Sequence, residues 1–407
     1  MKKSKTIYAL KLLIFLLFFG QNFEAIAQTN RKIDPSVFQT KKEGKIPFFV
    51  VMKSQADVSA AYNLETKEEK GEFVFSTLRN NAKASQADIQ YFLKSKNIDF
   101  QSFWIINALF MEGDALLINL LAARTDVAKI VANPTSRLQL PPTSASDFLP
   151  KNVETRSAEK LTWGLKKIKA DSVWQKNIRG QGVVIGGQDT GYDWAHPALK
   201  KSYRGFLNLK DFKDSANHNY NWHDAIHRDS TAPPNPCGYD LVTPCDDNSH
   251  GTHTMGTMSG SVTTNDSTAI GVAPDALWIG ARNMNRGNGT LRSYVECFEW
   301  FLAPTNLAGK MPNPRLAPHV INNSWYCSIE EGCNASNFAV LEAAVNACRA
   351  AGIVVVVSVG NSGSACSTAT GPPGFSQNRF RSVQPPKRIQ LQVLAVADPS
   401  VLTAVFA

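Results

Sequence analysis

The chain has 407 residues, and 43% of them are hydrophobic, which is ordinary for a globular protein and allows a large core. Its length predicts two or three domains. The net charge of +9 lies partly in the first residues, and the other Lys and Arg residues are scattered. The charge pattern therefore excludes a concentrated nucleic-acid-binding patch, and we expect no nucleic acid partner.

Residues 1–27 have the pattern of a secretory signal peptide. Four lysines among the first eleven residues surround the start of an apolar run at 12–19, and Ala25-Ile26-Ala27 supplies a small-x-small cleavage site. A membrane anchor is the alternative, but this run is too short to span a bilayer and no other stretch approaches spanning length. We expect a secreted protein, extracellular or periplasmic, with no membrane contact after signal cleavage.

Export makes the seven cysteines candidates for disulfides, because oxidising compartments favour them. Cys237 lies close to Cys245 in the sequence, and Cys327 lies close to Cys333, so each pair would staple a short loop. Three further cysteines leave at least one thiol unpaired within the chain, and the sequence does not fix the connectivity. There is no CxxC pair, so a zinc ribbon is not indicated. The three further cysteines are Cys297, Cys348 and Cys366.

Residues 28–150 are expected to form a small α+β sandwich followed by a linker. The simplest interpretation is a propeptide between the signal and a larger domain, and an unrelated binding module is the alternative. The linker is marked by Pro141, Pro142 and Pro150. The expected elements are strands at 46–53, 102–110 and 127–132, a helix or two helices broken near Asn80-Asn81 within 67–96, and a helix at 114–124.

Residues 151–407 change to buried strands alternating with helices, which is typical of a parallel sheet covered on both faces. In such α/β sheets, functional groups gather at the carboxyl ends of the strands. The expected strands are 183–189, 276–284, 319–325 and 352–360, and the expected helices are 290–302 and 338–351.

The stretch DDNSHGTHTMGTMSG, residues 246–260, places a histidine just before a helix-like run of small residues. The pattern favours a catalytic role for His250, and His253 follows one helical turn later. Two histidines three residues apart could instead form half of a metal site, because both lie on one helical face. Packing is the third interpretation. Further metal ligands are not identifiable.

Two more residues lie at or just beyond strand ends. Asp189 opens a DTG sequence; an aspartic protease would need a second such carboxylate, and the chain has no second DTG. Asn361, in GNSG after a β-branched run, could donate an amide N–H to an oxyanion, although Asn and Gly are also ordinary turn formers. A carboxylate, a histidine and an amide in one α/β domain favour a catalytic site.

These motifs resemble the subtilisin-like serine proteases. DTG at 189, NSHGTH at 248–253, VINNSW at 320–325 and VVSVGNSG at 356–363 occur in that family's order and spacing. The phrases WGLKKIKADSVW, DWAHPALKKSYRG, NWHDA, IGVAPDALWI, FEWFLAPT and APHVINNSW look like its bacillopeptidase F branch. The resemblance covers about residues 160–374, and residues 46–134 more weakly resemble the family's propeptide inhibitor, which has a ferredoxin-like fold.

The resemblance implies a role for each matching residue. Asp189 would orient His250, which would serve as the general base, and Asn361 would hydrogen-bond the oxyanion. His253 would be the family's non-catalytic histidine. No cofactor would be required, although structural calcium is common in the family. Polypeptide substrates would lie along two edge segments, and the propeptide would act as intramolecular inhibitor and chaperone. The edge residues are Gly289, Thr290, Leu291, Ser324 and Trp325.

The chain departs from the family pattern in two places. Tyr326 and Cys327 replace the glycines that usually follow the second edge segment. The nucleophile is the larger departure, because no serine after Asn361 has the family's Gly-Thr-Ser-Met context. We therefore expect a peptidase domain truncated before its nucleophile, inactive as given, whose incomplete sheet folds less readily than residues 28–150. The alternative is a pseudoenzyme that binds peptides or inhibits a protease without catalysis.

Overall fold

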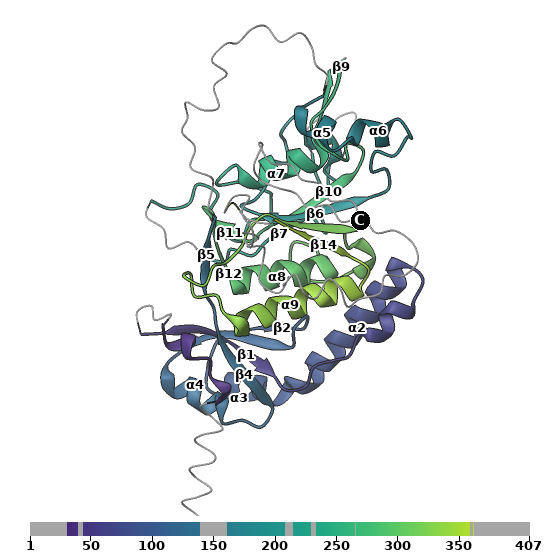
Figure 1. Cartoon of the computed structure of the whole chain (residues 1–407). Helices are drawn as coiled ribbons and strands as arrows, with labels where there is room; N and C mark the ends of the chain where they lie inside the picture. The colour runs from purple at the N-terminus through teal and green to yellow at the C-terminus, as the bar shows by residue number, and fades with distance from the viewer. Residues whose placement is uncertain are drawn as a thin grey trace, which may run out of the picture. The chain divides into compact units, whose positions relative to one another are not determined.

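The computed structural model describes residues 31–39, 44–138, 161–207, 215–228, 233–264, 266–358 and 361, and it divides into two compact units (Figure 1). Unit 1 contains the described residues up to Ala56 together with Arg79–Asn133, and unit 2 contains Asp57–Leu78 and the described residues from Pro134 onward. The expected signal peptide, the linker prolines and Cys366 lie outside the described residues. The domain boundaries at residues 28, 150 and 151 stay predictions.

Unit 1 is built on a four-stranded antiparallel sheet in the order β2-β3-β1-β4. Helical segments follow β1 and β3, so the chain has the β-α-β-β-α-β element order expected of a ferredoxin-like unit. Its elements are η1 (Pro35–Gln39), β1 (Ile46–Met52), the end of α2 (Lys67–Ser85), α3 (Ala87–Ser95), β2 (Phe100–Phe103), β3 (Ala108–Gly113), α4 (Ala115–Ala122) and β4 (Val127–Ala132).

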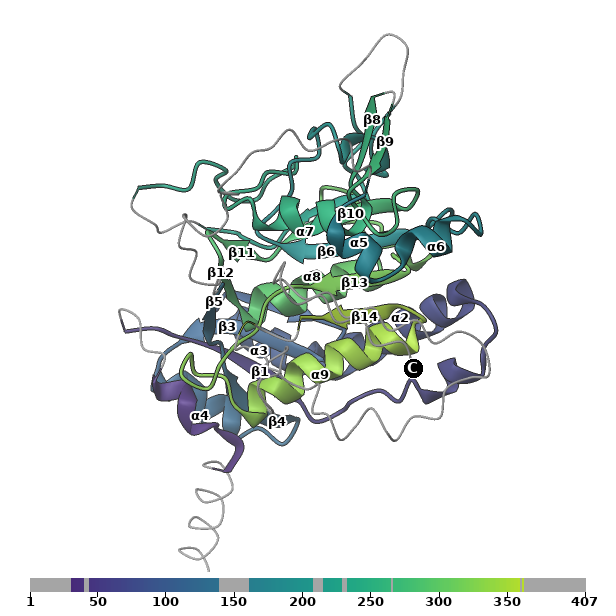
Figure 2. The same ribbon diagram turned by 45° about the horizontal axis from the view of Figure 1, so that its top comes forward.

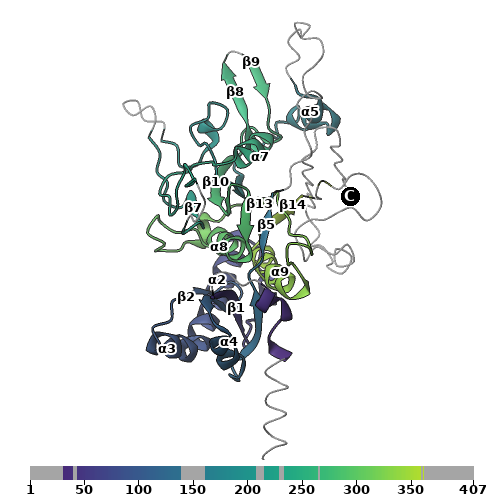
Figure 3. The same cartoon turned by 90° about the vertical axis from the view of Figure 1, so that its left-hand side faces the viewer.

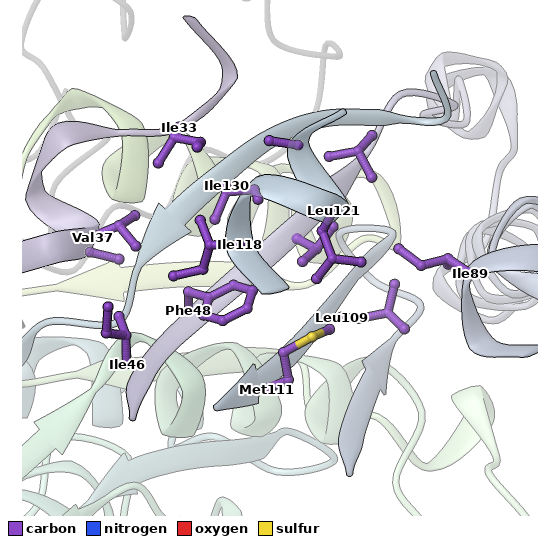
Figure 4. Close-up of a cluster of buried hydrophobic side chains, with 14 of the residues drawn as sticks. Ile33, Val37, Ile46, Phe48, Ile89, Leu109, Met111, Ile118, Leu121 and Ile130 are labelled. Atoms are coloured by element: carbon purple, nitrogen blue, oxygen red, sulfur yellow. The ribbon is translucent and has the colours of Figure 1, made fainter. Parts of the chain in front are cut away.

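The core of unit 1 lies between one face of this sheet and its helices (Figure 4). Alternate residues of β1, including Phe48, point to this face, because successive strand side chains alternate. Ile89 of α3 and Leu121 of α4 pack against them, and all three side chains are fully buried. On the opposite face the ring of Phe49 contacts that of Phe110, with centroids 5.4 Å apart.

Two local predictions for this region are wrong. Residues 102–110 form the two arms of a hairpin, β2 and β3, because Asn107 adopts a left-handed conformation (φ 40°) and turns the chain back. The helix break lies at Gln86 rather than at Asn80-Asn81, because the Asn81 side chain bonds Ser54 instead of competing with the helix backbone.

Unit 2 contains a five-stranded parallel sheet in the order β14-β13-β6-β10-β7, as the α/β prediction requires. Helix α7 lies on one side of the sheet, and α8 and α9 lie on the other (Figures 1 and 3). Its helices are the start of α2, α5 (Trp163–Lys167), α6 (Ala170–Trp174), α7 (His250–Ser259), α8 (Leu291–Leu302) and α9 (Ala335–Ala350), with 3₁₀ turns η2 (Ser59–Asn63), η3 (Lys200–Ser202) and η4 (Pro314–Leu316).

The strands in the described residues of unit 2 fall into three sheets. The parallel sheet consists of β6 (Val184–Asp189), β7 (Trp222–Asp224), β10 (Leu277–Arg282), β13 (Val320–Asn323) and β14 (Val354–Val357). A second sheet, in the order β11-β12-β5, contains β11 (Met284–Asn285), β12 (Asn288–Thr290) and β5 (Thr135–Arg137). A hairpin of β8 (Ser261–Thr264) and β9 (Asp266–Ala269) continues from α7.

Helix α7 begins at His250, as the sequence predicts, and α8 begins after Thr290, whose hydroxyl accepts a hydrogen bond from the Ser293 amide. Such capping fixes the first turn of a helix. In the described part of the chain, no helix is both long and apolar enough to cross a membrane.

Candidate active site

Asp189 and His250 meet at the carboxyl edge of the parallel sheet. Asp189 is the last residue of β6, and His250 is the first residue of α7. The His250 Nδ1 and Asp189 Oδ1 atoms lie 2.7 Å apart, and the two side chains are 9% and 1% exposed. The carboxylate therefore occupies Nδ1 and orients the ring, leaving Nε2 as the nitrogen that can accept or give a proton.

Burial and charge act in opposite directions on His250. Burial lowers the pKa of its imidazole, but the Asp189 carboxylate and its hydrogen bond, with a further contribution from Asp246, raise it above the ordinary value. An imidazole stabilised in its charged form by a buried carboxylate is suited to general acid–base chemistry.

Asp246 holds the start of α7 in place. Its Oδ1 accepts hydrogen bonds from the Thr190 hydroxyl (2.7 Å) and from the amides of Asn248 and Ser249 (3.1 and 2.9 Å). Its Oδ2 accepts from the amide and hydroxyl of Thr252. Ser249 sits at φ 69°, which is uncommon for a residue with a side chain, so these bonds secure a strained turn just before His250.

The loop after Asp189 approaches the start of α7 very closely. Gly191 has φ 111°, and a Cβ there would collide with the Cys245 carbonyl. A Cβ on Gly251 would collide with the Gly191 carbonyl. Glycine at both positions lets the backbones approach. The predicted pair Cys237–Cys245 forms a disulfide that closes the loop leading into this contact, and Cys327–Cys333 forms a second one.

A buried line of polar side chains crosses the strand ends beside Asp189. Asn283 Nδ2 donates to Gln188 Oε1 (3.1 Å), and Gln188 Nε2 donates to Asn323 Oδ1 (2.6 Å). Asn323 Nδ2 in turn donates to the Val356 carbonyl of β14 (2.9 Å). We call Asn283, Gln188 and Asn323 the amide ladder. It links the ends of neighbouring strands and so fixes the position of Asp189.

Arg282 supports the same edge from β10. Its guanidinium is fully buried and contacts Asp247 Oδ2 at 2.9 Å and Asp224 Oδ2 at 3.4 Å. Asp247 Oδ1 also accepts the Arg286 amide at 3.0 Å. The buried ion pair therefore ties the end of β10 to the loop that carries Asp246 and, three residues after Asp247, His250.

The first predicted edge segment is a strand that is already paired. Gly289 and Thr290 lie in β12, and Leu291 is the buried first residue of α8. The antiparallel strand β5 pairs along β12, with Gly289 opposite Ser136 (Figure 2). The edge of β12 is thus occupied by an antiparallel strand of the same chain.

The second segment follows β13. Ser324 Oγ accepts a hydrogen bond from Asn322 (2.9 Å), and Trp325 is buried against Tyr294 with parallel rings whose centroids are 3.6 Å apart. Asn361 is exposed beyond the end of β14. Since β6, β13 and β14 are parallel, Asp189 at the end of β6 and Ser324 and Asn361 beyond the ends of β13 and β14 lie at the same edge.

His253 does not share the environment of His250. It is exposed on α7, while His250 is held by Asp189. Among the described residues, no group of three or more His, Cys, Asp or Glu side chains is arranged to hold a metal ion.

Sequence reasoning gave no role to Asp246, Arg282 or the amide ladder. Asp246 had a usable signal, because an Asp a few residues before a helix commonly bonds the free amides of its first turn. The amide ladder had no usable sequence signal, since Gln188 and Asn323 are 135 residues apart in the chain.

A parallel sheet that carries an Asp–His pair at its carboxyl edge places the chain among α/β proteins equipped for acid–base catalysis. The chain belongs to the subtilase family, because that family's model matches residues 180–400, more than half of the chain. The match extends beyond residue 374, where the motif resemblance ends.

Bacillopeptidase F of Bacillus subtilis (strain 168) is 29% identical over 385 residues, which cover 88% of this chain. Subtilisin Savinase of Lederbergia lenta is 27% identical over 51% of this chain and 58% of its own length. This chain spans 25% of the length of bacillopeptidase F. The structure of the epidermin leader peptide processing serine protease of Staphylococcus aureus aligns over 78% of this chain and 61% of its own, with 14% identity and a TM-score of 0.45.

Proposed function

We propose that this chain belongs to the precursor of a secreted subtilisin-like serine endopeptidase, which hydrolyses peptide bonds with an Asp/His/Ser triad. The buried hydrogen bond between His250 Nδ1 and Asp189 Oδ1 is the observation that carries the proposal. Family membership supports it, because the pair lies in the matched region.

In this proposal His250 is the general base. Its Nε2 takes the proton of a serine hydroxyl while the oxygen attacks the substrate carbonyl carbon, and it then gives the proton to the departing amine. Asp189 stays ionised and stabilises the imidazolium. Asn361 donates its side-chain N–H to the oxyanion, and the loss of one such donor slows kcat by about 10²–10³. This chemistry needs no cofactor. Structural calcium stays a prediction without assigned ligands.

The substrates are polypeptides held in extended form. A peptide strand alongside β12 would meet Gly289 and Thr290, with Leu291, Ser324 and Trp325 shaping the surroundings. The pairing of β5 with β12 supports this role, because it shows that the edge of β12 takes an antiparallel strand.

The N-terminal part of the chain is proposed to be the propeptide that inhibits the enzyme and assists its folding. The β-α-β-β-α-β order of unit 1 supports this, as does the position of β5, which occupies the edge proposed for substrates. Secretion is supported by the pattern of residues 1–27 and by two disulfides, which oxidising compartments favour.

The proposed nucleophile is a serine in a Gly-Thr-Ser-Met segment, which the 407 residues do not contain. The protein produced from its native locus should react with a serine-directed fluorophosphonate, and a polypeptide limited to these 407 residues should not. If the locus product is folded and remains unlabelled, the endopeptidase proposal fails and a non-catalytic peptide-binding protein becomes the better interpretation.

A further inference from the structure

Ser136 is the buried residue of an otherwise exposed strand. In β5, Thr135 and Arg137 are exposed, whereas Ser136 is 2% exposed and lies opposite Gly289 of β12. Side chains alternate along a strand, so Ser136 points into unit 2 while its neighbours point away.

The side chain of Ser136 packs against Tyr294 and the residues around it. The Ser136 Oγ and the Tyr294 hydroxyl share a hydrogen bond. Within the described residues, it is the one hydrogen bond that the Tyr294 hydroxyl makes. Tyr294 is 2% exposed, and its ring stacks on Trp325 with an interplanar angle of 3°. A Cβ on Gly289 would collide with the Tyr294 hydroxyl, so bare backbone at Gly289 leaves room for that group. We call Gly289, Tyr294 and Trp325 the Tyr294 pocket.

The backbone contacts of β5 indicate where the Tyr294 pocket lies along a bound peptide. The Leu138 amide donates to the Gly287 carbonyl (2.6 Å), and the Arg137 amide donates to Glu331 Oε1 (2.8 Å). A Cβ built on Gly287 would lie 3.0 Å from Leu138 Cβ and 3.6 Å from Asn248 Nδ2, and Asn248 precedes His250 by two residues. The chain therefore runs from the pocket toward the histidine, and the pocket lies on the N-terminal side of the bond to be cut.

We propose that Tyr294 is a specificity-determining residue that selects a small hydroxyl-bearing side chain, serine or threonine, at the substrate position opposite Gly289. Ser136 is the example that the chain itself supplies. This inference rests on the proposed peptidase function, since it names the substrate class of that site.

The selection follows from the cost of a buried unpaired hydroxyl. Alanine at this position would leave the Tyr294 hydroxyl without its partner in a region that excludes water, and a site built to bond a hydroxyl rejects analogues that lack it. A large aromatic side chain would collide with the stacked rings of Tyr294 and Trp325, which form the bottom of the Tyr294 pocket.

The first test needs no catalysis. Hydrogen exchange of the Leu138 amide in the full chain reports how tightly β5 is held. Ser136→Ala and Tyr294→Phe should each speed this exchange about fivefold, and Thr135→Ala, the exposed matched control, should leave it unchanged. The double variant should exchange no faster than either single one, because the two hydroxyls act as one pair. Unchanged exchange in the single variants, or effects that multiply in the double one, would overturn the proposal.

The second test measures specificity in the active protein. Peptides that carry Ser, Thr, Ala, Val or Phe at the position opposite Gly289 should be cleaved with kcat/KM about tenfold higher for Ser than for Ala. Tyr294→Phe should reduce this ratio to below about twofold while cleavage continues. An equal ratio in both proteins would contradict the inference. If no peptide is cleaved at all, the peptidase function fails, and the exchange measurement still decides whether Tyr294 recognises the hydroxyl.

Discussion

At the scale of single residues, two carboxylates set the protonation of His250. Both Asp189 and Asp246 raise the pKa of its imidazole against the effect of burial. The charged form is therefore favoured in the folded protein, so the stability that it adds is present below the ordinary histidine pKa and is lost as pH rises through the raised value. The neutral ring that a general base requires appears only above that value.

Asp246→Asn should lower the pKa of His250, because it removes a negative charge while keeping an oxygen near the α7 amides. NMR titration of the His250 ring measures this directly, and the acidic limb of the kcat/KM profile should move to lower pH. Asp88→Asn, an exposed site in unit 1, is the control. A pKa of His250 that stays constant or rises would contradict the assignment.

His227 lies between two carboxylates. Its Nδ1 is 2.5 Å from Asp240 Oδ1 and its Nε2 is 2.7 Å from Glu296 Oε1, so both ring nitrogens carry protons. Burial lowers the pKa of His227, but Glu296 and Asp240 outweigh it and raise the pKa to about 9. Burial likewise raises the pKa of Glu296, but His223 and His227 hold it well below its usual range.

Because the pKa of His227 is raised on folding, its contribution is complete below about pH 6.5 and disappears as pH rises through about 9. Urea unfolding between pH 6 and 10 should show wild type losing about 2 kcal/mol relative to His227→Gln over this range. His253→Gln, at an exposed histidine, should follow wild type. Parallel pH profiles for wild type and His227→Gln would refute the assignment.

At the scale of secondary-structure elements, the amide ladder links β10, β6 and β13 and bonds the β14 backbone. Gln188→Met keeps the volume but leaves the Asn283 donor and the Asn323 acceptor without these bonds. The free energy of unfolding should fall by about 2 to 4 kcal/mol, measured by urea titration. Gln175→Met, at an exposed glutamine, should change it by less than about 0.5 kcal/mol. A Gln188→Met protein as stable as that control would show that the ladder contributes nothing.

Strand and helix positions in unit 2 could be predicted from sequence because their signals are local. The β-branched run VVVV marks β14, and Thr290 marks the start of α8. The hairpin at 100–113 was hidden because its apolar residues continue through the turn, where Asn107 is the one polar side chain between Trp104 and Ala108.

The candidate site was predictable as far as its motifs extend. Asp189 and His250 could be singled out, since Asp189 opens the DTG sequence and His250 is followed by Gly251 in NSHGTH. Arg282 and Tyr294 were not, because their roles depend on partners distant in sequence: Tyr294 meets Ser136, 158 residues away. Long-range polar contacts leave no periodic signal that a sequence could reveal.

At the scale of the whole molecule, unit 1 has an apolar core of its own. The isolated fragment 28–150 should therefore unfold cooperatively on heating, monitored by circular dichroism. Phe48→Ala within this fragment should cost about 3 to 5 kcal/mol, because Phe48 is fully buried in that core. A broad, non-cooperative transition in the unsubstituted fragment would show that unit 1 depends on the rest of the chain.

The most direct measurement for the whole protein is active-site labelling. The product of the native locus, treated with a fluorophosphonate, should be labelled on a serine; His250→Ala should abolish the labelling, Asp189→Asn should slow it about 10⁴-fold, and His253→Ala should leave it intact. Labelling that persists unchanged in the folded His250→Ala protein would contradict the assignment of Asp189 and His250 as the catalytic pair.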